Sequence, residues 1–128
     1  MGKLTIIATI PHKEQKYDTV GNYWTDREGN LQIRVSDLQN PKMEMLIVIH
    51  ELIEKMLVDH AGISDDDITA FDEKFEKKRL SGNIDEPGDD KNCNYKKEHC
   101  IATGIERIMC SLLGVDWKTY EEKCNNAK

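Results

Sequence analysis

The longest helical pattern in the chain is PKMEMLIVIHELIEKMLVDH, which runs from Pro41 to His60. Asn40 precedes it and is a favourable N-cap, while Pro41 suits the first helical position, where its missing N–H costs nothing. Gly62 follows the last turn and can take the left-handed backbone that ends a helix. The sequence therefore predicts one long helix, around which the remaining elements are arranged.

The two sides of this predicted helix differ in character. At about 100° per residue, one broad face is apolar and carries Met45, Leu46, Ile49, Leu52, Ile53 and Met56. The opposite side carries His50, Glu51, Glu54 and Lys55, together with Ile47 and Val48. A helix that is apolar nearly all round at one end is typical of a buried central helix. His50 and Glu54 are therefore expected to face a covered space, where polar groups need partners.

Alternating residues on the amino-terminal side predict a small antiparallel sheet. Leu4 to Ile10 alternates and is expected to form a strand that Pro11 ends. Residues 23–25 and 31–35 are expected to pair as a hairpin, because residues 26–30 between them have turn chemistry. The inward positions of its second strand are Leu31, Ile33 and Val35.

Three further helices are predicted after Gly62. The first is capped by Ser64 and buries a stripe of Ile68, Phe71, Phe75 and Leu80. The second runs from Tyr95 to Leu113, and its apolar stripe consists of Ile101, Ala102, Ile105, Ile108, Met109 and Leu112. The third, Asp116 to Cys124, is short and is anchored by Trp117 and Tyr120. These helices follow a sheet, so the predicted class is α+β.

The elements fit one domain over residues 1–128. Residues 81–94, rich in Gly, Pro, Asp and Asn, form a loop long enough to suggest a functional cover. Residues 125–128 are expected to be a frayed tail. In this arrangement the sheet packs with the central helix and three others.

Composition limits the classes of function. One third of the 128 residues are charged and the net charge is −6, which disfavours nucleic-acid binding because a basic stripe is the usual footprint of such proteins. No apolar run approaches the roughly 20 residues of a membrane helix, and the alternating first residues do not resemble a signal peptide. A cytoplasmic protein is therefore expected. Its four cysteines, which include no Cys-x-x-Cys pair, are expected to be free thiols.

The central helix carries the motif His50-Glu51-Leu52-Ile53-Glu54. His50 and Glu54 are four residues apart and are neighbours on one helical face, so they can hold one divalent cation. In His-Glu-x-x-His enzymes the ends of the motif bind zinc, and the second-position Glu acts as general base on a water held by the metal. Here Glu51 occupies that position. The fifth residue is Glu54 instead of His, a ligand that zinc accepts but that also suits manganese or iron. A solvated helix face with a Glu51–Lys55 pair is the alternative explanation.

A third ligand is required, and the helix after the loop offers candidates. His99 is favoured, with Glu98 as the close alternate and Glu106 further along the edge of the stripe as a supporting residue. His60 has the spacing of a third zincin ligand, but Leu57 stands where such enzymes place the Gly that breaks the helix. The choice among His99, Glu98 and His60 stays open.

Three side chains outside the motif helix are candidates for covering the site. His12 and Tyr17 belong to the first long loop and would point over it, although an ordinary surface loop would also carry such residues. Tyr95 precedes His99 and could offer its phenol to an oxyanion.

The chain resembles a functionally uncharacterised family of small proteins in phage and prophage genomes. The resemblance spans almost the whole chain and rests on Pro11-His12, Gln15, Tyr17-Asp18-Thr19-Val20-Gly21, Leu31-Gln32-Ile33-Arg34-Val35-Ser36-Asp37, His50-Glu51-Leu52-Ile53-Glu54, Asp85-Glu86-Pro87-Gly88-Asp89-Asp90, Tyr95, Glu98-His99, Ala102-Thr103, Ile105-Glu106-Arg107 and Leu113-Gly114-Val115-Asp116-Trp117. It implies a phage setting, hence the cytoplasm of a bacterial host, and one compact domain, but no reaction. Separately, the hairpin, motif helix and downstream helix are similar to a minimal zincin, a metallopeptidase-like fold.

Three functions follow from these patterns. The first is a metal-dependent hydrolase, a zincin-like peptidase with Glu51 as base, His50, Glu54 and His99 as ligands, and a peptide or protein as substrate. The second is a non-catalytic accessory or partner-binding protein on the same fold. The third is an all-helical, magnesium-dependent nucleotide pyrophosphohydrolase, suggested by Glu51 and Glu54 followed by Asp72, Glu73 and Glu76 in the next helix, although the amino-terminal strands and His50 argue against it. The sequence does not give an oligomeric state.

Overall fold

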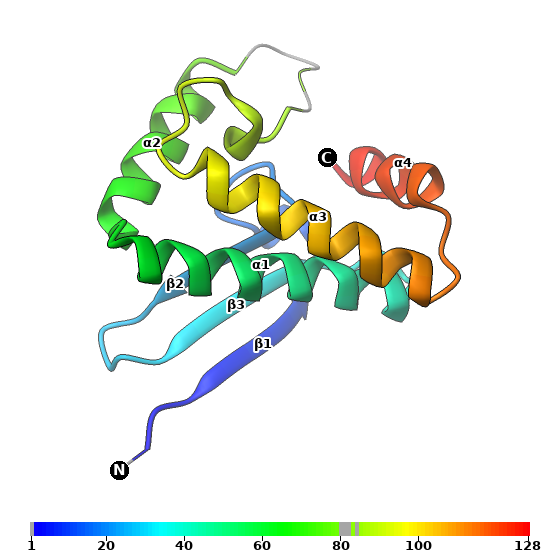
Figure 1. Ribbon diagram of the computed structural model, residues 1–128, viewed down its shortest axis with the longest axis horizontal. Coiled ribbons are helices and arrows are strands. Elements are labelled where there is room, and N and C mark those ends of the chain that lie inside the picture. Colours follow the sequence, from blue (N-terminus) through cyan, green and yellow to red (C-terminus); the bar gives the residue numbers. More distant parts are fainter. Residues whose placement is uncertain (1, 80–82, 84) are drawn as a thin grey trace.

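The chain forms a three-stranded mixed sheet followed by four α-helices in the part that is described, which is residues 2–79, 83 and 85–128 of a computed structural model (Figure 1). The strands are β1 (Thr5–Ile10), β2 (Gly21–Thr25) and β3 (Leu31–Ser36). The helices are α1 (Pro41–Ala61), α2 (Asp65–Lys77), α3 (Lys96–Leu112) and α4 (Trp117–Ala127), with two short 3-10 turns, η1 (His12–Glu14) and η2 (Pro87–Asp89). The predicted α+β class is confirmed, and an all-helical fold is not what the chain adopts.

The strand order is β1-β3-β2, and its pairing only partly follows the prediction. The hairpin of β2 and β3 is antiparallel as expected, and Gly29 takes the positive φ of 84° that its turn requires. Strand β1, however, pairs with β3 in parallel, with Thr5 opposite Leu31. The prediction of a purely antiparallel sheet was wrong because alternation of residues does not encode strand order. The loop after β1 crosses the end of β3 and places β2 on the far edge.

A side-chain clasp fixes that crossing loop to the end of β3. The two ring nitrogens of His12 lie 2.8 Å from Ser36 Oγ and 2.7 Å from Asp18 Oδ1, and Gln15 Nε2 donates to Ser36 Oγ at 3.2 Å. This set of Ser, His and Asp is not a nucleophilic site, because Ser36 is fully buried. His12 therefore holds the fold together and does not point over the motif helix, contrary to the prediction.

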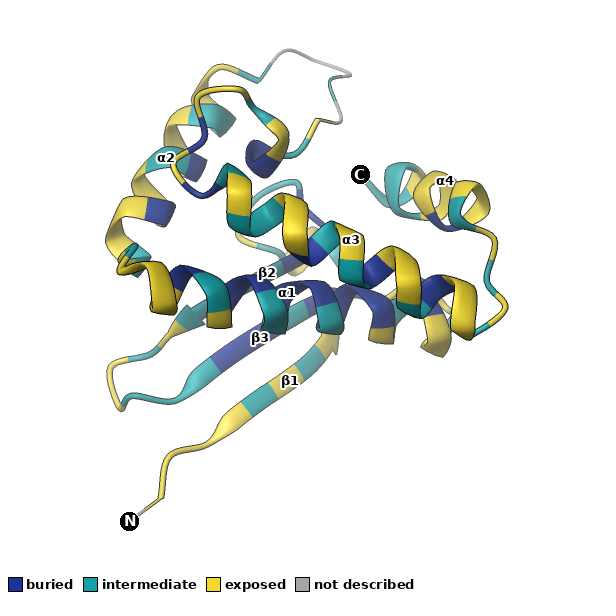
Figure 2. Cartoon of the chain, in the orientation of Figure 1, coloured by how far each residue is buried: buried dark blue, intermediate teal, exposed yellow. Residues whose placement is uncertain are grey.

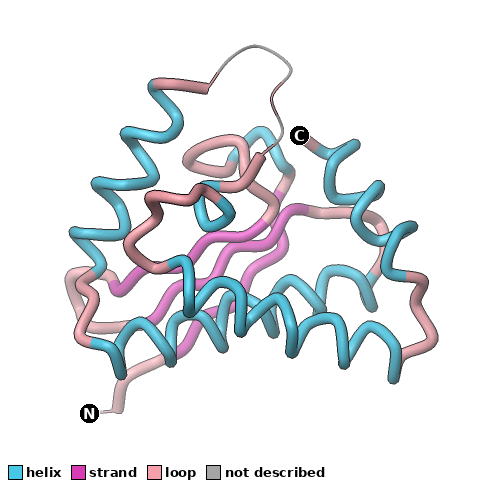
Figure 3. The backbone as a smooth tube through the Cα atoms, turned by 45° about the horizontal axis from the view of Figure 1, so that its top comes forward, coloured by secondary structure: helices cyan, strands magenta, loops and turns pink. Residues whose placement is uncertain are grey.

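Helix α1 begins and ends where the sequence predicts. The Asn40 side chain accepts a hydrogen bond from the backbone N–H of Met43, and Gly62 ends the helix with a φ of 76°. The helix packs against β2 and β3 on one side and against α3 on the other, as Figures 1 and 3 show. This central position confirms its organising role.

The side of α1 that carries His50 and Glu54 is buried as predicted, but the apolar face that was expected to be buried is covered only in part. Of the predicted apolar face only Leu46 is fully buried, whereas Met45 and Met56 are 52% and 59% exposed. His50, Glu51 and Glu54 are buried, together with Ile47, Val48 and Val58. Figure 2 shows buried, intermediate and exposed stretches alternating along α1. The inward position of His50 and Glu54 is supported by hydrogen bonds to groups inside the protein.

Helix α2 follows the prediction closely. Ser64 caps it by accepting from the N–H of Asp67, Ile68 is buried, and Phe71 and Phe75 are half-buried. Leu80, the last predicted member of that stripe, lies outside the described residues.

Helices α3 and α4 depart from the prediction in which residues they bury. The buried residues of α3 are Ala102, Glu106 and Cys110, spaced by four, whereas Ile108 and Leu112 of the predicted stripe are 62% and 73% exposed. Helix α4 has Tyr120 buried as predicted, but it continues to Ala127. The predicted frayed tail was wrong, because the Lys128 side chain is 3% exposed and forms an ion pair with Glu86.

None of the helices in the described ranges is long and apolar enough to cross a membrane. The cysteines at positions 93, 100, 110 and 124 are free thiols, in agreement with the prediction.

Candidate metal centre

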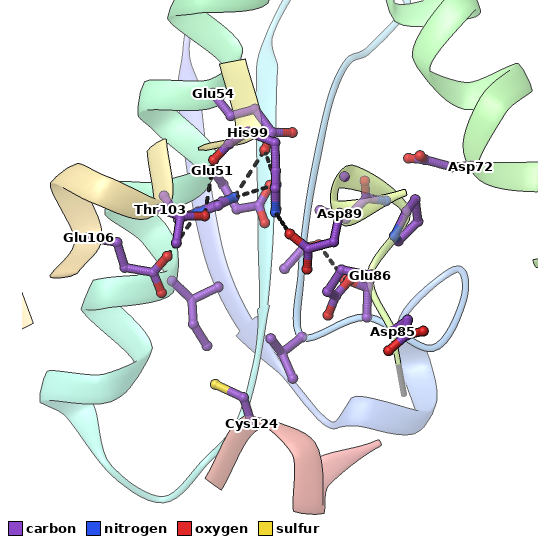
Figure 4. A pocket seen from close by; sticks show the side chains of 18 of the residues that line it. Glu51, Glu54, Asp72, Asp85, Glu86, Asp89, His99, Thr103, Glu106 and Cys124 are labelled. Carbon is purple, nitrogen blue, oxygen red and sulfur yellow. Dashed lines mark hydrogen bonds and ion pairs between the residues drawn. The ribbon is translucent and has the colours of Figure 1, made fainter. Parts of the chain in front are cut away.

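Three potential metal ligands from two helices meet beside α1. His50 Nε2 lies 3.0 Å from Glu54 Oε2 and 3.2 Å from His99 Nδ1, and His99 Nδ1 lies 2.9 Å from the same Glu54 oxygen. His50 and Glu54 are one turn apart on α1, and His99 reaches them from the first turn of α3 (Figure 4). The structure thus brings together the three residues that the sequence singled out as ligands.

Both imidazoles are oriented by a second carboxylate. His50 Nδ1 lies 2.8 Å from Glu106 Oε1, and His99 Nε2 lies 3.2 Å from Asp89 Oδ1. An ionised carboxylate only accepts hydrogen bonds, so these outer nitrogens carry the protons. In the neutral rings, His50 Nε2 and His99 Nδ1 are then left with lone pairs that point at each other and at Glu54. Such an arrangement requires positive charge at its centre.

Two buried tyrosines hold the carboxylates in place. Tyr23 of β2 donates its hydroxyl proton to Glu54 Oε1 at 3.0 Å, so Oε2 remains for the two histidines. Tyr120 of α4 donates to Glu106 Oε2, the oxygen that does not contact His50. Each carboxylate thus has one oxygen fixed by a phenol and the other directed at an imidazole. Metal ligands in proteins are commonly oriented by such outer contacts.

The pKa values of the three residues reflect the same convergence. Burial alone would lower the pKa of His50, but its hydrogen bonds to Glu106 and Glu54 raise it well above the usual value. For His99, the effect of burial is likewise exceeded by the hydrogen bonds to Asp89 and Glu54, which raise its pKa to about 9. Burial opposes ionisation of Glu54, yet the two histidines lower its pKa to about 2. Without a metal, the cluster therefore favours protonated histidines around an ionised carboxylate.

Glu51 lies beside this cluster and lacks a partner of its own. Its side chain is buried, with an exposed fraction of 9%, and it forms no hydrogen bond or ion pair with any residue in the described ranges. Burial and the negative charge of Glu54 raise its pKa to about 8. Glu51 is outside the group of atoms that could bind one ion together. It also does not pair with Lys55, which binds Asp59 and Asp65 instead, so the solvated-face explanation of the motif does not hold.

These residues line a cavity of about 400 Å³ between α1, β2, α3, α4 and the segment that contains η2. Two glycines allow the backbone to approach the cluster. A side chain at Gly21 would collide with Glu51, and one at Gly88 would collide with the ring of His99. On the opposite wall, Asp72 of α2 accepts hydrogen bonds from Tyr17 and Tyr95.

The other residues that the sequence suggested for the site do not belong to the group of possible ligands. Glu98 is one residue away from His99 but is not part of the ligand group, and His60 is exposed in the last turn of α1. Glu106 is close to the site as predicted, where it orients His50. Tyr95 lines the cavity, although its hydroxyl is engaged by Asp72. Tyr17 also lines the cavity, in agreement with the prediction for that loop.

The sequence analysis did not assign roles to Tyr23 or Asp89, and it considered Asp72 only as an acidic residue for the magnesium site of a pyrophosphohydrolase. Tyr23 was the first residue of the predicted strand 23–25, which was too short to show an inward side; the observed strand begins at Gly21, and Gly21 and Tyr23 are both buried. Asp72 follows Ile68 by one helical turn and therefore lies on the buried side of α2, an unusual position for a carboxylate. Asp89 belongs to the acidic loop and carried no signal that distinguished it from its neighbours.

Comparisons of the chain with protein-family models, with curated protein sequences and with solved structures give no match. The function must therefore be argued from the site itself.

The close approach at Gly21 gives a stability prediction. A Cβ atom at this position would lie under 3.0 Å from both Glu51 and Ile47, so we expect Gly21→Ala to destabilise the fold by about 1–3 kcal/mol. Gly104 is the matched control, because it lies within α3 and a Cβ there has no neighbour within 4 Å. Gly104→Ala should stabilise by about 0.5–1 kcal/mol. Denaturant unfolding measures both, and equal effects of the two changes would contradict the proposed close packing.

Proposed function

We propose that the chain is a metal-dependent hydrolase of the zincin type, with one divalent cation bound by His50, Glu54 and His99. The observation that carries this proposal is the convergence of three ligand atoms whose other polar atoms are all occupied. His50, His99 and Glu54 each use their second polar atom to contact Glu106, Asp89 and Tyr23, respectively. Three lone pairs that converge in this way can be donated together to one cation.

The spacing of these atoms fits zinc. Zinc binds nitrogen and oxygen at roughly 2.0–2.2 Å in tetrahedral sites, so neighbouring ligand atoms are about 3.4 Å apart. The three separations here are 3.0, 3.2 and 2.9 Å, so small side-chain movements suffice. Two imidazoles and one carboxylate are also a ligand set of catalytic zinc sites, in which the fourth position is open. Manganese or iron would suit the same set.

Glu51 is suited to be the general base. A zinc ion held at this site would lower the pKa of its bound water to about 7 and so make hydroxide available at neutral pH. Glu51 lies on the next position of the same helix as His50, is buried, and has no partner among the described residues. Without metal, its raised pKa keeps Glu51 largely protonated at neutral pH, but a cation held beside it would favour the carboxylate, which would take a proton from water and deliver it to a leaving group. We propose a peptide as substrate by analogy of motif and fold with metallopeptidases.

Elemental analysis tests the metal site. Protein purified without a metal-affinity tag should contain close to one divalent metal per chain, and His50→Ala should contain almost none. His60→Ala is the matched control, because His60 is exposed on the same helix and away from the cluster. Equal metal content in the wild type and in His50→Ala would refute the proposed site.

A further inference from the structure

A second polar cluster faces the same cavity from the side of α2. Asp72 is 5% exposed, and its two oxygens accept hydrogen bonds from Tyr17 at 2.7 Å and from Tyr95 at 2.6 Å. All three residues line the cavity that contains the proposed metal ligands. Figure 4 shows Asp72 extending from α2 toward the space that His99 reaches from the other side. The cluster is therefore part of the cavity wall, fixed by its own hydrogen bonds.

Asp72 is a buried carboxylate of this cavity that has no cationic partner in the described part of the chain. Glu86 pairs with Lys128, Asp89 pairs with His99, and Glu54 and Glu106 contact His50. Within the described part of the chain, no Lys, Arg or His nitrogen lies within 4.0 Å of Asp72 or Glu51. Glu51 is explained by the proposed hydrolytic role, which leaves Asp72 as a buried charge without compensation. Buried charges are normally paired.

The hydrogen-bonding character of the cluster defines what could pair with it. Both phenol protons are already directed at Asp72, so the cluster presents acceptor atoms to the cavity and no free donor. An ammonium group has three donors and no acceptor, and a guanidinium has five donors. Either group matches a set of acceptors around one negative charge, whereas a neutral amide or an anion does not.

We propose that Asp72, framed by Tyr17 and Tyr95, is a specificity pocket that binds an ammonium or guanidinium group of the substrate beside the metal centre. The inference rests on the proposed function for the reaction, but the binding site itself exists without the metal. The cation can come from a Lys or Arg side chain or from a peptide amino terminus. In both cases it positions the peptide between α2 and the motif helix.

Three short peptides of equal length provide the probes. They are N-acetyl-Ala-Lys-Ala-amide, the same peptide with Nε-acetyl-lysine, and Ala-norleucine-Ala-amide with a free amino terminus. Calorimetric titration of the zinc-loaded protein should show that the lysine peptide binds roughly 10- to 100-fold more tightly than its acetylated form, as expected for hydrogen bonds to a charged group. The third peptide tells whether an amino terminus supplies the cation equally well.

Asp72→Asn should remove this preference, whereas Asp66→Asn should retain it, because Asp66 is exposed on the same helix. Metal content and thermal unfolding of both variants show that they are folded. If Asp72→Asn does not fold, the comparison of the two lysine peptides on the wild type still decides. Equal binding of these peptides, or a preference that survives in Asp72→Asn, would overturn the proposal. Repeating the titrations on metal-free protein separates the two proposals. If elemental analysis finds no metal in the wild type but the lysine peptide still binds more tightly than its acetylated form, the cation pocket stands and the metal-dependent hydrolase is refuted.

Discussion

Glu51→Gln is expected to abolish hydrolysis while leaving the metal bound. The substitution keeps the size of the side chain but removes its ability to accept a proton as a carboxylate. Because general base catalysis contributes typically 10²–10⁴-fold, kcat should fall by about this factor. The metal should stay, since Glu51 is outside the group of atoms that could bind one ion together. Parallel measurement of peptide hydrolysis and of metal content checks both parts.

Glu54→Gln is the matched comparison for this experiment, because it makes the same chemical change one turn along α1. Glu54 Oε2 contacts both histidines, so its loss should remove metal and hydrolysis together. Glu73→Gln, on the exposed side of α2, should change neither. If Glu51→Gln lost the metal as Glu54→Gln does, Glu51 would be a ligand, and the assignment of the base would fail.

The ends of the helices and the hairpin could be predicted because their signals are local. Asn40, Ser64 and Gly62 act on backbone groups within four residues, so the sequence alone locates the boundaries that they set. The β2–β3 hairpin is equally local. The parallel pairing of β1 is not, because it depends on how the crossing loop attaches to Ser36, far along the chain.

The prediction that His50 and Glu54 face a covered space is confirmed, but the apolar stripes predicted for α1 and α3 are largely not the buried ones. Periodicity treats apolar residues as inward and charged residues as outward, and in α2 this holds for Ile68 but not for the buried Asp72. In α1 the inward residues include His50 and Glu54, which are hydrogen-bonded to groups on other elements, and Glu51, which has no such partner in the described ranges. In α3 the small Ala102 and the hydrogen-bonded Glu106 face inward, and Ile108 faces solvent. Hydrogen-bond partners on other elements cannot be recognised from the periodicity of one helix.

The grouping of the three proposed ligands was predictable because its signals are local. His50 and Glu54 share a helical face by spacing alone, and His99 belongs to the helix that follows an unusually long loop. The residues that support them could not be found in this way, because Tyr23, Asp89 and Tyr120 come from three other segments. Only folding brings these side chains within hydrogen-bonding distance of the proposed ligands and of Glu106.

Metal removal is expected to lower the melting temperature strongly, and the decrease should be larger at higher pH. A metal that binds only the folded chain stabilises it by about 4 kcal/mol when its free concentration is 1,000 times Kd. For a domain of this size the melting temperature should fall by roughly 10–20 °C on chelation. Without metal, the raised pKa values of His50 and His99 mean that protonated imidazoles take over part of this role.

The pH dependence follows from the sign of those shifts. A histidine whose pKa is raised on folding contributes stability that is complete below its unfolded pKa of about 6.5 and is lost as pH rises through its folded pKa. For His99 that value is about 9, so the metal-free protein should lose stability between roughly pH 6.5 and 9. The metal-loaded protein should not, because metal binding displaces these protons and becomes tighter as pH rises. Melting curves at pH 6.5 and 8.5, with zinc and with chelator, should therefore diverge at the higher pH. In His50→Ala the curves with zinc and chelator should coincide at both values, and a difference as large as that of the wild type would place the stabilising metal elsewhere.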